Sequence, residues 1–371
     1  MGMSSTRRSF LATAALSAGT LLSRAAEPPA PAAEDKAAPK PKAKDKGKEK
    51  PKPDPYADAV LVPGDPAPIA AGAFTLAVLP DTQYYCKQYP DNFAAQTRWI
   101  MEQRTARNIA GVLHLGDITN SNTPEEWQVA VRALKQLDAR LPLCMVAGNH
   151  DYGPGGRCTG RDTDFSTFLP PAFHRGRPSF GGFYDREPER VENSFHRIDA
   201  GGRKLLILCL EFGPRPDVVR WAREVVARHA DRQVILVTHA FTYHNDTRYD
   251  WKKHGKKQAN NPHEYEIAKA PGGVTDGEEL WQSLVAPAGN FLFTINGHVT
   301  SDGLGRLATP DAKGRSVHQM LVNFQMRPRG GDGWLRLLEF RPDSTLFVSD
   351  YSPTRRERNE SPQNQFTLTL A

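Results

Sequence analysis

Side chains that can bind metals or move protons follow a short apolar segment near the middle of the chain. The apolar residues 141–146 lead directly into Gly148, Asn149, His150 and Asp151. In open α/β sheets, ligands bind just beyond the carboxyl ends of strands. An amide, an imidazole and a carboxylate in such a position predict a binding or catalytic site.

The same kind of chemistry recurs after other apolar segments. The mixture of carboxylate, amide and imidazole without thiolate favours divalent or trivalent ions such as Mn, Fe or Zn over soft metals. Two ions about 3.5–4 Å apart need a bridging ligand, and Asp117, which is midway in the order, is the natural bridge. The further candidates are Asp81 and Gln83 after residues 74–79, Asp117 after 111–115, His239 after 234–238 and His298 after 291–296.

Alternating strands and helices must bring these side chains together. Residues 74–79, 111–117 and 141–146 are expected to be strands, separated by helices over 92–109 and from Thr123 to about Arg140, with Thr123 as cap and Pro124 in the first turn. The spacing suits successive βαβ units, whose strand ends lie side by side at one edge of a sheet. His114, inside a strand, is expected to be packed rather than a ligand.

The second half of the chain continues the pattern and adds two long polar loops. Strands are expected over 204–210, 234–238 and 291–296, and helices over 216–232 and 278–285. Three late apolar segments, 317–324, 334–340 and 345–348, are expected to be antiparallel strands that complete a second sheet. The loops, 152–192 and 241–277, are expected to determine the substrate.

The N-terminal region differs in composition from the rest. Arg7 and Arg8 precede a short Ala/Leu-rich stretch, which is typical of a twin-arginine export signal over residues 1–26 and too short for a stable membrane span. Residues 27–58, rich in Pro, Ala and Lys, predict a disordered linker, and residues 59–371 one domain. We therefore expect export to the periplasm or the cell exterior.

Charge and cysteine content narrow the possible partners. The formal net charge is +6, but most of it lies before residue 59, so the domain is not predicted to bind nucleic acid. Cys144 and Cys209 lie in apolar segments and are expected to be core thiols. Cys86 and Cys158 lie in loops, where a disulfide after export and two free thiols are both open alternatives.

The order of the motifs resembles that of the calcineurin-like metallophosphoesterase superfamily. The resemblance covers residues 74 to about 300 and implies an α/β fold, a four-layer αββα sandwich of two mixed sheets flanked by helices. The first motif resembles that of exported bacterial members with Asp-Thr-Gln. The matching residues are Asp81-Thr82-Gln83, Gly116-Asp117, Gly148-Asn149-His150-Asp151, His239 and Gly297-His298-Val299-Thr300.

The resemblance also implies roles for these residues. Asp117 would bridge two ions, with Asn149, His239 and His298 on one ion and Asp81 and Gln83 on the other. His150 would act as the catalytic residue beside the scissile phosphate, with Asp151 as a supporting partner. The implied activity is phosphodiesterase or phosphatase, with a metal-bridging water or hydroxide as nucleophile and a phosphate ester as substrate.

Two positions depart from the family pattern. Gln83 and Thr300 stand where the family has histidines, so the ion on the Asp81/Gln83 side is expected to bind more weakly. The alternative function is a cell-surface binding protein, inactive or weakly active, that retains the fold. The substrate-binding residues, the oligomeric state and the identity of the metal are not specified by the sequence.

Overall fold

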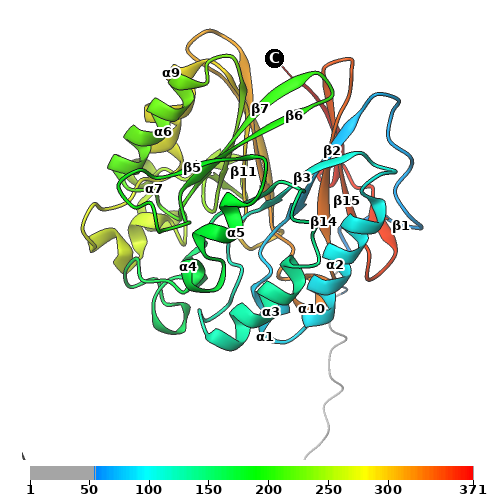
Figure 1. Ribbon diagram of the computed structural model, residues 1–371, viewed down its shortest axis with the longest axis horizontal. Coiled ribbons are helices and arrows are strands. Elements are labelled where there is room, and N and C mark those ends of the chain that lie inside the picture. The colour runs from blue at the N-terminus through cyan, green and yellow to red at the C-terminus, as the bar shows by residue number, and fades with distance from the viewer. Residues whose placement is uncertain (1–53, 55, 371) are drawn as a thin grey trace, which may run out of the picture. The chain divides into compact units, whose positions relative to one another are not determined.

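The computed structural model describes residue 54 and residues 56–370. The predicted export signal and most of the predicted linker lie outside the described residues. The last linker residues contact the domain, because the Tyr56 hydroxyl donates to Asp332 at 2.6 Å and Asp58 pairs with Arg327 at 2.8 Å. The described chain contains two large mixed sheets with helices on their outer sides (Figure 1).

The first sheet carries the strands that precede Asp81, Asp117 and Asn149. Strands β2, β3 and β4 are parallel neighbours, so the predicted βαβ units are confirmed and their carboxyl ends share one edge. The order is β1 (Leu61–Pro63), β16 (Glu357–Asn359), β15 (Thr345–Ser352), β14 (Leu335–Phe340), β2 (Phe74–Leu79), β3 (Ile109–His114) and β4 (Leu143–Met145), and β17 (Gln365–Thr369) pairs with β15.

The second sheet carries the strands that precede His239 and His298. Strands β7, β8, β11 and β13 run parallel, so their carboxyl ends also share one edge. The order is β12 (Leu304–Pro310), β13 (Ser316–Val322), β11 (Phe291–Asn296), β8 (Gln233–Thr238), β7 (Arg203–Leu210), β6 (Ser194–Ala200) and β5 (Phe180–Phe183).

The expectation that the three late segments are antiparallel strands that complete the second sheet was right in part. β13 lies in the second sheet, where it is antiparallel to β12 and parallel to β11. β14 and β15 belong to the first sheet, where β14 pairs antiparallel with β2. The chain crosses between the sheets after β13, and an apolar pattern shows that a segment is buried without showing which strand it pairs with.

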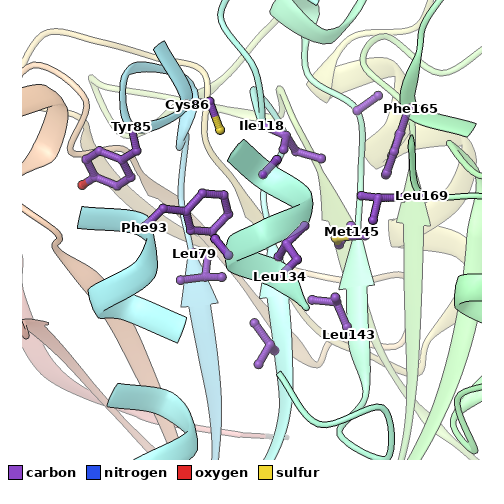
Figure 2. Packing of buried hydrophobic residues seen from close by; sticks show 14 of the residues in the cluster. Leu79, Tyr85, Cys86, Phe93, Ile118, Leu134, Leu143, Met145, Phe165 and Leu169 are labelled. Carbon is purple, nitrogen blue, oxygen red and sulfur yellow. The ribbon is translucent and has the colours of Figure 1, made fainter. Parts of the chain in front are cut away.

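Helices cover the outer face of each sheet. Buried side chains of α1 (Gln83–Lys87), α2 (Pro90–Gln103) and α3 (Pro124–Leu134) pack on the first sheet (Figure 2). Those of α6 (Pro216–Arg228), α8 (Gly277–Leu280) and the π-helical turn Trp281–Val285 pack on the second, near α9 (Ala286–Ala288). A third apolar cluster joins the facing sides of the two sheets. The predicted four-layer αββα sandwich is therefore confirmed.

Helix ends and loops differ from the expectations in detail. α2 ends at Gln103 and α3 at Leu134, both earlier than predicted, although the Thr123 cap and the Pro124 start are present. The first long loop contains α4 (Phe165–Phe168) and α5 (Pro171–Arg175). The second contains β9 (Thr242–Tyr243), β10 (Thr247–Arg248), α7 (Trp251–His254) and three 3₁₀ turns, Gly255–Lys257, Pro262–Glu264 and Glu266–Lys269. The segment after β13 contains α10 (Pro328–Gly331).

All four cysteines are buried free thiols, so Cys86 and Cys158 are not paired in this structure. Burial raises the pKa of the Cys86 thiol well above its usual value, which keeps the group protonated. Among residues 54 and 56–370, no helix combines the length and the apolar character that a membrane span requires.

Candidate metal centre

Carboxylate and imidazole groups from both sheets meet where the carboxyl ends of their strands face each other. Ligand atoms of Asp117, His239 and His298 lie within 4.8 Å of one another. His239 Nε2 is 3.2 Å from Asp117 Oδ1 and 3.2 Å from Asn149 Oδ1. Carboxylate, amide and imidazole atoms at these separations suit a shared cation.

Backbone carbonyls fix the orientation of both imidazoles. His239 Nδ1 lies 2.7 Å from the carbonyl oxygen of Leu115, and His298 Nε2 lies 2.8 Å from that of Asn260. Because a carbonyl accepts only, each of these nitrogens carries a proton, and the other nitrogen of each ring is the one left to bind a cation. This arrangement is typical of metal-binding histidines.

Asp81 connects the two sheets at this cluster. The backbone N–H of His298 donates to both carboxylate oxygens of Asp81, at 3.1 and 2.9 Å, and His239 Nδ1 is 3.9 Å from Asp81 Oδ1. A carboxylate from the first sheet is thereby held against a strand end of the second.

Gln83 provides the test of whether the residues fit a cation on the Asp81 side. Its side chain is buried and Oε1 has no hydrogen-bond partner among the described residues. An unsatisfied buried oxygen is costly, and a bound cation would satisfy it. Thr300 stands where the family pattern has an imidazole, and its carbonyl accepts from the backbone N–H of Gly303 at 3.0 Å.

Burial and mutual proximity set the charges of this cluster. Burial raises the pKa of Asp81 to about 8, and Asp117 adds to the increase. Burial opposes ionisation of Asp117 too, but His239 and His150 hold its pKa well below the usual range. Burial disfavours protonation of His239, yet Asp117 raises its pKa to about 9. Burial lowers the pKa of His298 to about 3, which leaves a neutral imidazole suited to a metal.

Close backbone packing explains the glycines of the motifs. A Cβ on Gly148 would lie 2.2 Å from Asp117 Oδ1, and one on Gly297 would lie 2.3 Å from Asp81 Oδ1. Asp117 and His298 have left-handed backbone angles, with φ of 46° and 73°. Strained residues of this kind concentrate at functional sites.

His150 lies at the edge of the cluster and is half-buried. Its backbone N–H donates to Asp117 Oδ1 at 2.9 Å, and its Nδ1 lies 2.8 Å from the carbonyl oxygen of Asn120. Asp151, expected as a supporting partner of His150, acts on the backbone and does not orient the ring. The carboxylate of Asp151 instead accepts from backbone N–H groups of Gly148 and Thr119 at 2.9 and 2.8 Å, which braces the loops that carry His150 and Asp117.

Other residues near the cluster support it without being ligands. His114 is buried and its Nε2 lies 3.0 Å from Thr82 Oγ1, so the expectation of a packed histidine agrees with the structure.

Three aromatic rings, here named the aromatic wall, lie around His298, and they were not predicted from the sequence. The rings of Phe212, Tyr249 and Tyr265 lie 5.1, 6.0 and 6.1 Å from the His298 ring. The position of Phe212, two residues after the end of β7, was the one available signal.

A second group of possible ligands has a structural explanation. His263, Asp276 and Glu279 lie close together, but Asp276 caps α8 and accepts from the backbone N–H of Glu279 at 3.0 Å. His263 Nε2 is hydrogen-bonded to Glu279 at 2.8 Å. These contacts already use the polar atoms of the group.

A family model described as calcineurin-like phosphoesterase matches residues 74–300. The chain belongs to this family, which supports phosphoester hydrolysis in general and normally depends on two metal ions. It is 29% identical over 325 residues to a Bacillus subtilis protein named "Uncharacterized protein YvnB", covering 82% of this chain. The chain spans 22% of the length of that relative.

Two solved structures are also similar. One is a 5'-nucleotidase precursor from Thermus thermophilus, with 14% identity, a TM-score of 0.39, and coverage of 80% of this chain and 54% of that chain. The other is GAP50, the anchor in the inner membrane complex of Plasmodium, with 10% identity, a TM-score of 0.41, and coverage of 80% of this chain and 88% of that chain.

Proposed function

We propose that this protein is an exported hydrolase of phosphoric esters that uses two metal ions of the Mn, Fe or Zn type. The observation that carries the proposal is the convergence of Asp81, Asp117, His239 and His298 at the facing strand ends of the two sheets. Family membership supports the phosphate-ester class of substrate. Export rests on the Arg7-Arg8 segment alone.

The ions would be held by the residues that the geometry brings together. Asp117 would be shared, with His239, His298 and Asn149 on one side and Asp81 and Gln83 on the other. When bound, the ions supply Lewis-acid stabilisation of the phosphoryl oxygens and activation of the attacking water. The chain itself orients the imidazoles through backbone carbonyls and excludes water with the aromatic wall around His298.

His150 is the residue that we assign to proton transfer or charge stabilisation. Its Nδ1 is held by the Asn120 carbonyl, so Nε2 is the atom available to a phosphate ester. An imidazolium there would stabilise the developing negative charge and protonate the leaving oxygen.

The first experiment tests the metal centre. Wild-type protein with added Mn²⁺ should hydrolyse bis-p-nitrophenyl phosphate or p-nitrophenyl phosphate, and Asp117→Ala should lower kcat/KM about 100-fold or more. Asp231→Ala, an exposed carboxylate paired with Lys204, is the matched control and should retain activity.

The alternative of a binding protein is favoured by one observation, the absence of imidazoles at positions 83 and 300. It predicts little or no turnover of either substrate at any metal concentration. Absence of turnover in the wild type would therefore support this alternative and overturn the hydrolase.

A second experiment tests His150. His150→Ala should lower kcat about 100-fold or more while the metal content per chain stays unchanged, because its ring contacts the Asn120 carbonyl rather than a proposed ligand. Equal turnover in the wild type and the variant would remove the role, and a parallel loss of metal would reassign His150 as a ligand.

A further inference from the structure

Residues 249–260, here named the lysine loop, leave the candidate metal centre and return to it. At its start, the ring of Tyr249 lies 6.0 Å from the ring of His298. At its end, the carbonyl of Asn260 accepts the hydrogen bond from His298 Nε2 at 2.8 Å. Both ends of the loop are therefore fixed beside the same proposed metal ligand.

The lysine loop carries a concentration of positive charge. Lys252, Lys253, Lys256 and Lys257 are all exposed, and none of them forms an ion pair within the described part of the chain. The one acid of the loop, Asp250, accepts from the backbone N–H of Lys253 at 2.9 Å and so serves to cap α7.

Several neighbouring charged residues form contacts of their own. Arg161 and Arg215 pair with Glu211 at 3.2 and 2.9 Å. Glu264 accepts from the backbone N–H of Asn260 at 2.9 Å, and Glu279 is bound to His263. The lysines thus add unpaired positive charge to a loop whose two ends lie beside His298.

Internal hydrogen bonds hold the loop in shape. Gln258 is buried, its amide nitrogen donates to the carbonyl of Arg248 at 2.8 Å, and its oxygen accepts from the N–H of Asp250 at 2.8 Å. The Tyr249 hydroxyl donates to the carbonyl of Ala259 at 3.1 Å. A braced loop presents its charges with less entropic cost on binding than a flexible one does.

We propose that the lysine loop binds phosphates that flank the scissile phosphate, and that the substrate is a linear phosphodiester chain. The inference rests on the proposed function, since the metal centre must act on one phosphate while the loop holds others. A small ester with one phosphate would leave these lysines without a partner. Multiple phosphates on a flexible chain match several exposed ammonium groups, which bind phosphate as point charges.

The loop is better suited to a soluble polyanion than to a lipid surface. Trp251, the large aromatic residue of α7, is half-buried and stacked on His263 with ring centroids 6.1 Å apart. It is therefore not presented for insertion into a bilayer, as interfacial aromatic residues are.

The test compares chain-like and small substrates. The variant with Lys252, Lys253, Lys256 and Lys257 all changed to Gln should lose about 10-fold or more in kcat/KM on poly(glycerol phosphate) or on a single-stranded oligonucleotide at low salt. On bis-p-nitrophenyl phosphate it should stay within about twofold of wild type. Added salt should slow wild-type hydrolysis of the chain substrate and leave the small diester unaffected.

A matched control removes the same charge elsewhere. Arg220, Arg223, Arg228 and Lys313 are exposed, and three of them line a cavity of about 710 Å³ between α6 and the β12–β13 turn. Changing these four residues to Gln should leave both substrates unaffected.

Each outcome decides between the proposals. Three outcomes would overturn the lysine-loop inference alone. The lysine variant and the control variant could lose kcat/KM equally, or the lysine variant could lose it equally on chain and small substrates. The third outcome is binding to anionic vesicles without salt-sensitive hydrolysis of the chain substrate. Absence of turnover on every substrate would overturn the proposed function together with it. Whichever chain substrate shows the larger lysine dependence identifies the source of the phosphodiester.

Discussion

At the scale of single residues, the candidate metal centre depends on backbone atoms that hold side chains in place. The carbonyls of Leu115 and Asn260 each hold one ring nitrogen of His239 and of His298, and so determine which nitrogen is left to bind a cation. Gln83, in contrast, has a buried oxygen without a partner among the described residues. The difference predicts unequal affinity for the two proposed ions, because a neutral amide is a weaker ligand than an imidazole for Mn, Fe or Zn.

Replacing Gln83 by His should restore the missing imidazole. We expect Gln83→His to bring the metal content of purified protein closer to two ions per chain, measured by elemental analysis after dialysis with Mn²⁺. The control is Gln88→His, which adds an imidazole at the exposed end of the same helix. Two tightly bound ions in the wild type would contradict the expectation of a weak Asp81 side.

Gly148 should not tolerate a side chain. A Cβ there would lie 2.2 Å from both the backbone nitrogen and Oδ1 of Asp117, so Gly148→Ala must displace Asp117, the proposed bridging ligand. We expect loss of bound metal and of turnover, with far-ultraviolet circular dichroism unchanged. Gly160→Ala is the control, since nothing lies within 4 Å of its added Cβ. Full activity of Gly148→Ala would show that Asp117 is not the bridging ligand.

At the scale of elements, strand ends determine the site. The polar residue after each buried apolar segment could be predicted from the sequence, because parallel strands in βαβ units share one edge. The pairing of β14 with β2 could not, because a strand buried on both faces reads the same in either sheet. The lysine loop was expected as a substrate loop, but its return to His298 depends on a carbonyl of Asn260, and backbone contacts leave no trace in side-chain types.

The cap of α3 gives a test at this scale. Thr123 accepts from the backbone N–H of Glu126 at 3.4 Å and begins the helix that covers the first sheet. Thr123→Ala should lower the free energy of unfolding by about 0.5–1 kcal/mol, measured by urea denaturation. Thr105→Ala, at an exposed position, should change it little. An equal effect of both substitutions would mean that the hydroxyl does not cap the helix.

At the scale of the whole molecule, the buried layers contain imidazoles remote from the candidate metal centre. His174 in α5 packs edge-on against the rings of Phe173 and Phe183, with centroids 5.4 and 5.7 Å away. His196 in β6 lies beside Phe180 at 5.8 Å. Burial lowers the pKa of His174 to about 4 and that of His196 to about 3, so both are neutral in the folded protein.

These imidazoles should make the fold sensitive to acid. In the unfolded chain a histidine titrates near pH 6.5. Below that pH the unfolded state therefore binds protons that the folded state does not bind. Stability is therefore complete above about pH 6.5 and falls as the pH decreases toward about 4. For His174 the full loss is on the order of 3–4 kcal/mol, from about 1.4 kcal/mol for each unit of pKa difference.

His174→Phe should flatten this dependence. The phenyl ring can occupy the same aromatic cluster without binding a proton, so the decrease in unfolding free energy between pH 7.5 and pH 4.5 should be smaller than in the wild type. Urea denaturation of both proteins at the two pH values measures it, with a chelator present so that loss of metal does not contribute. The carboxylates are common to both proteins, so their contribution cancels in the comparison. Parallel pH curves would show that the buried imidazole of His174 is not a source of acid sensitivity.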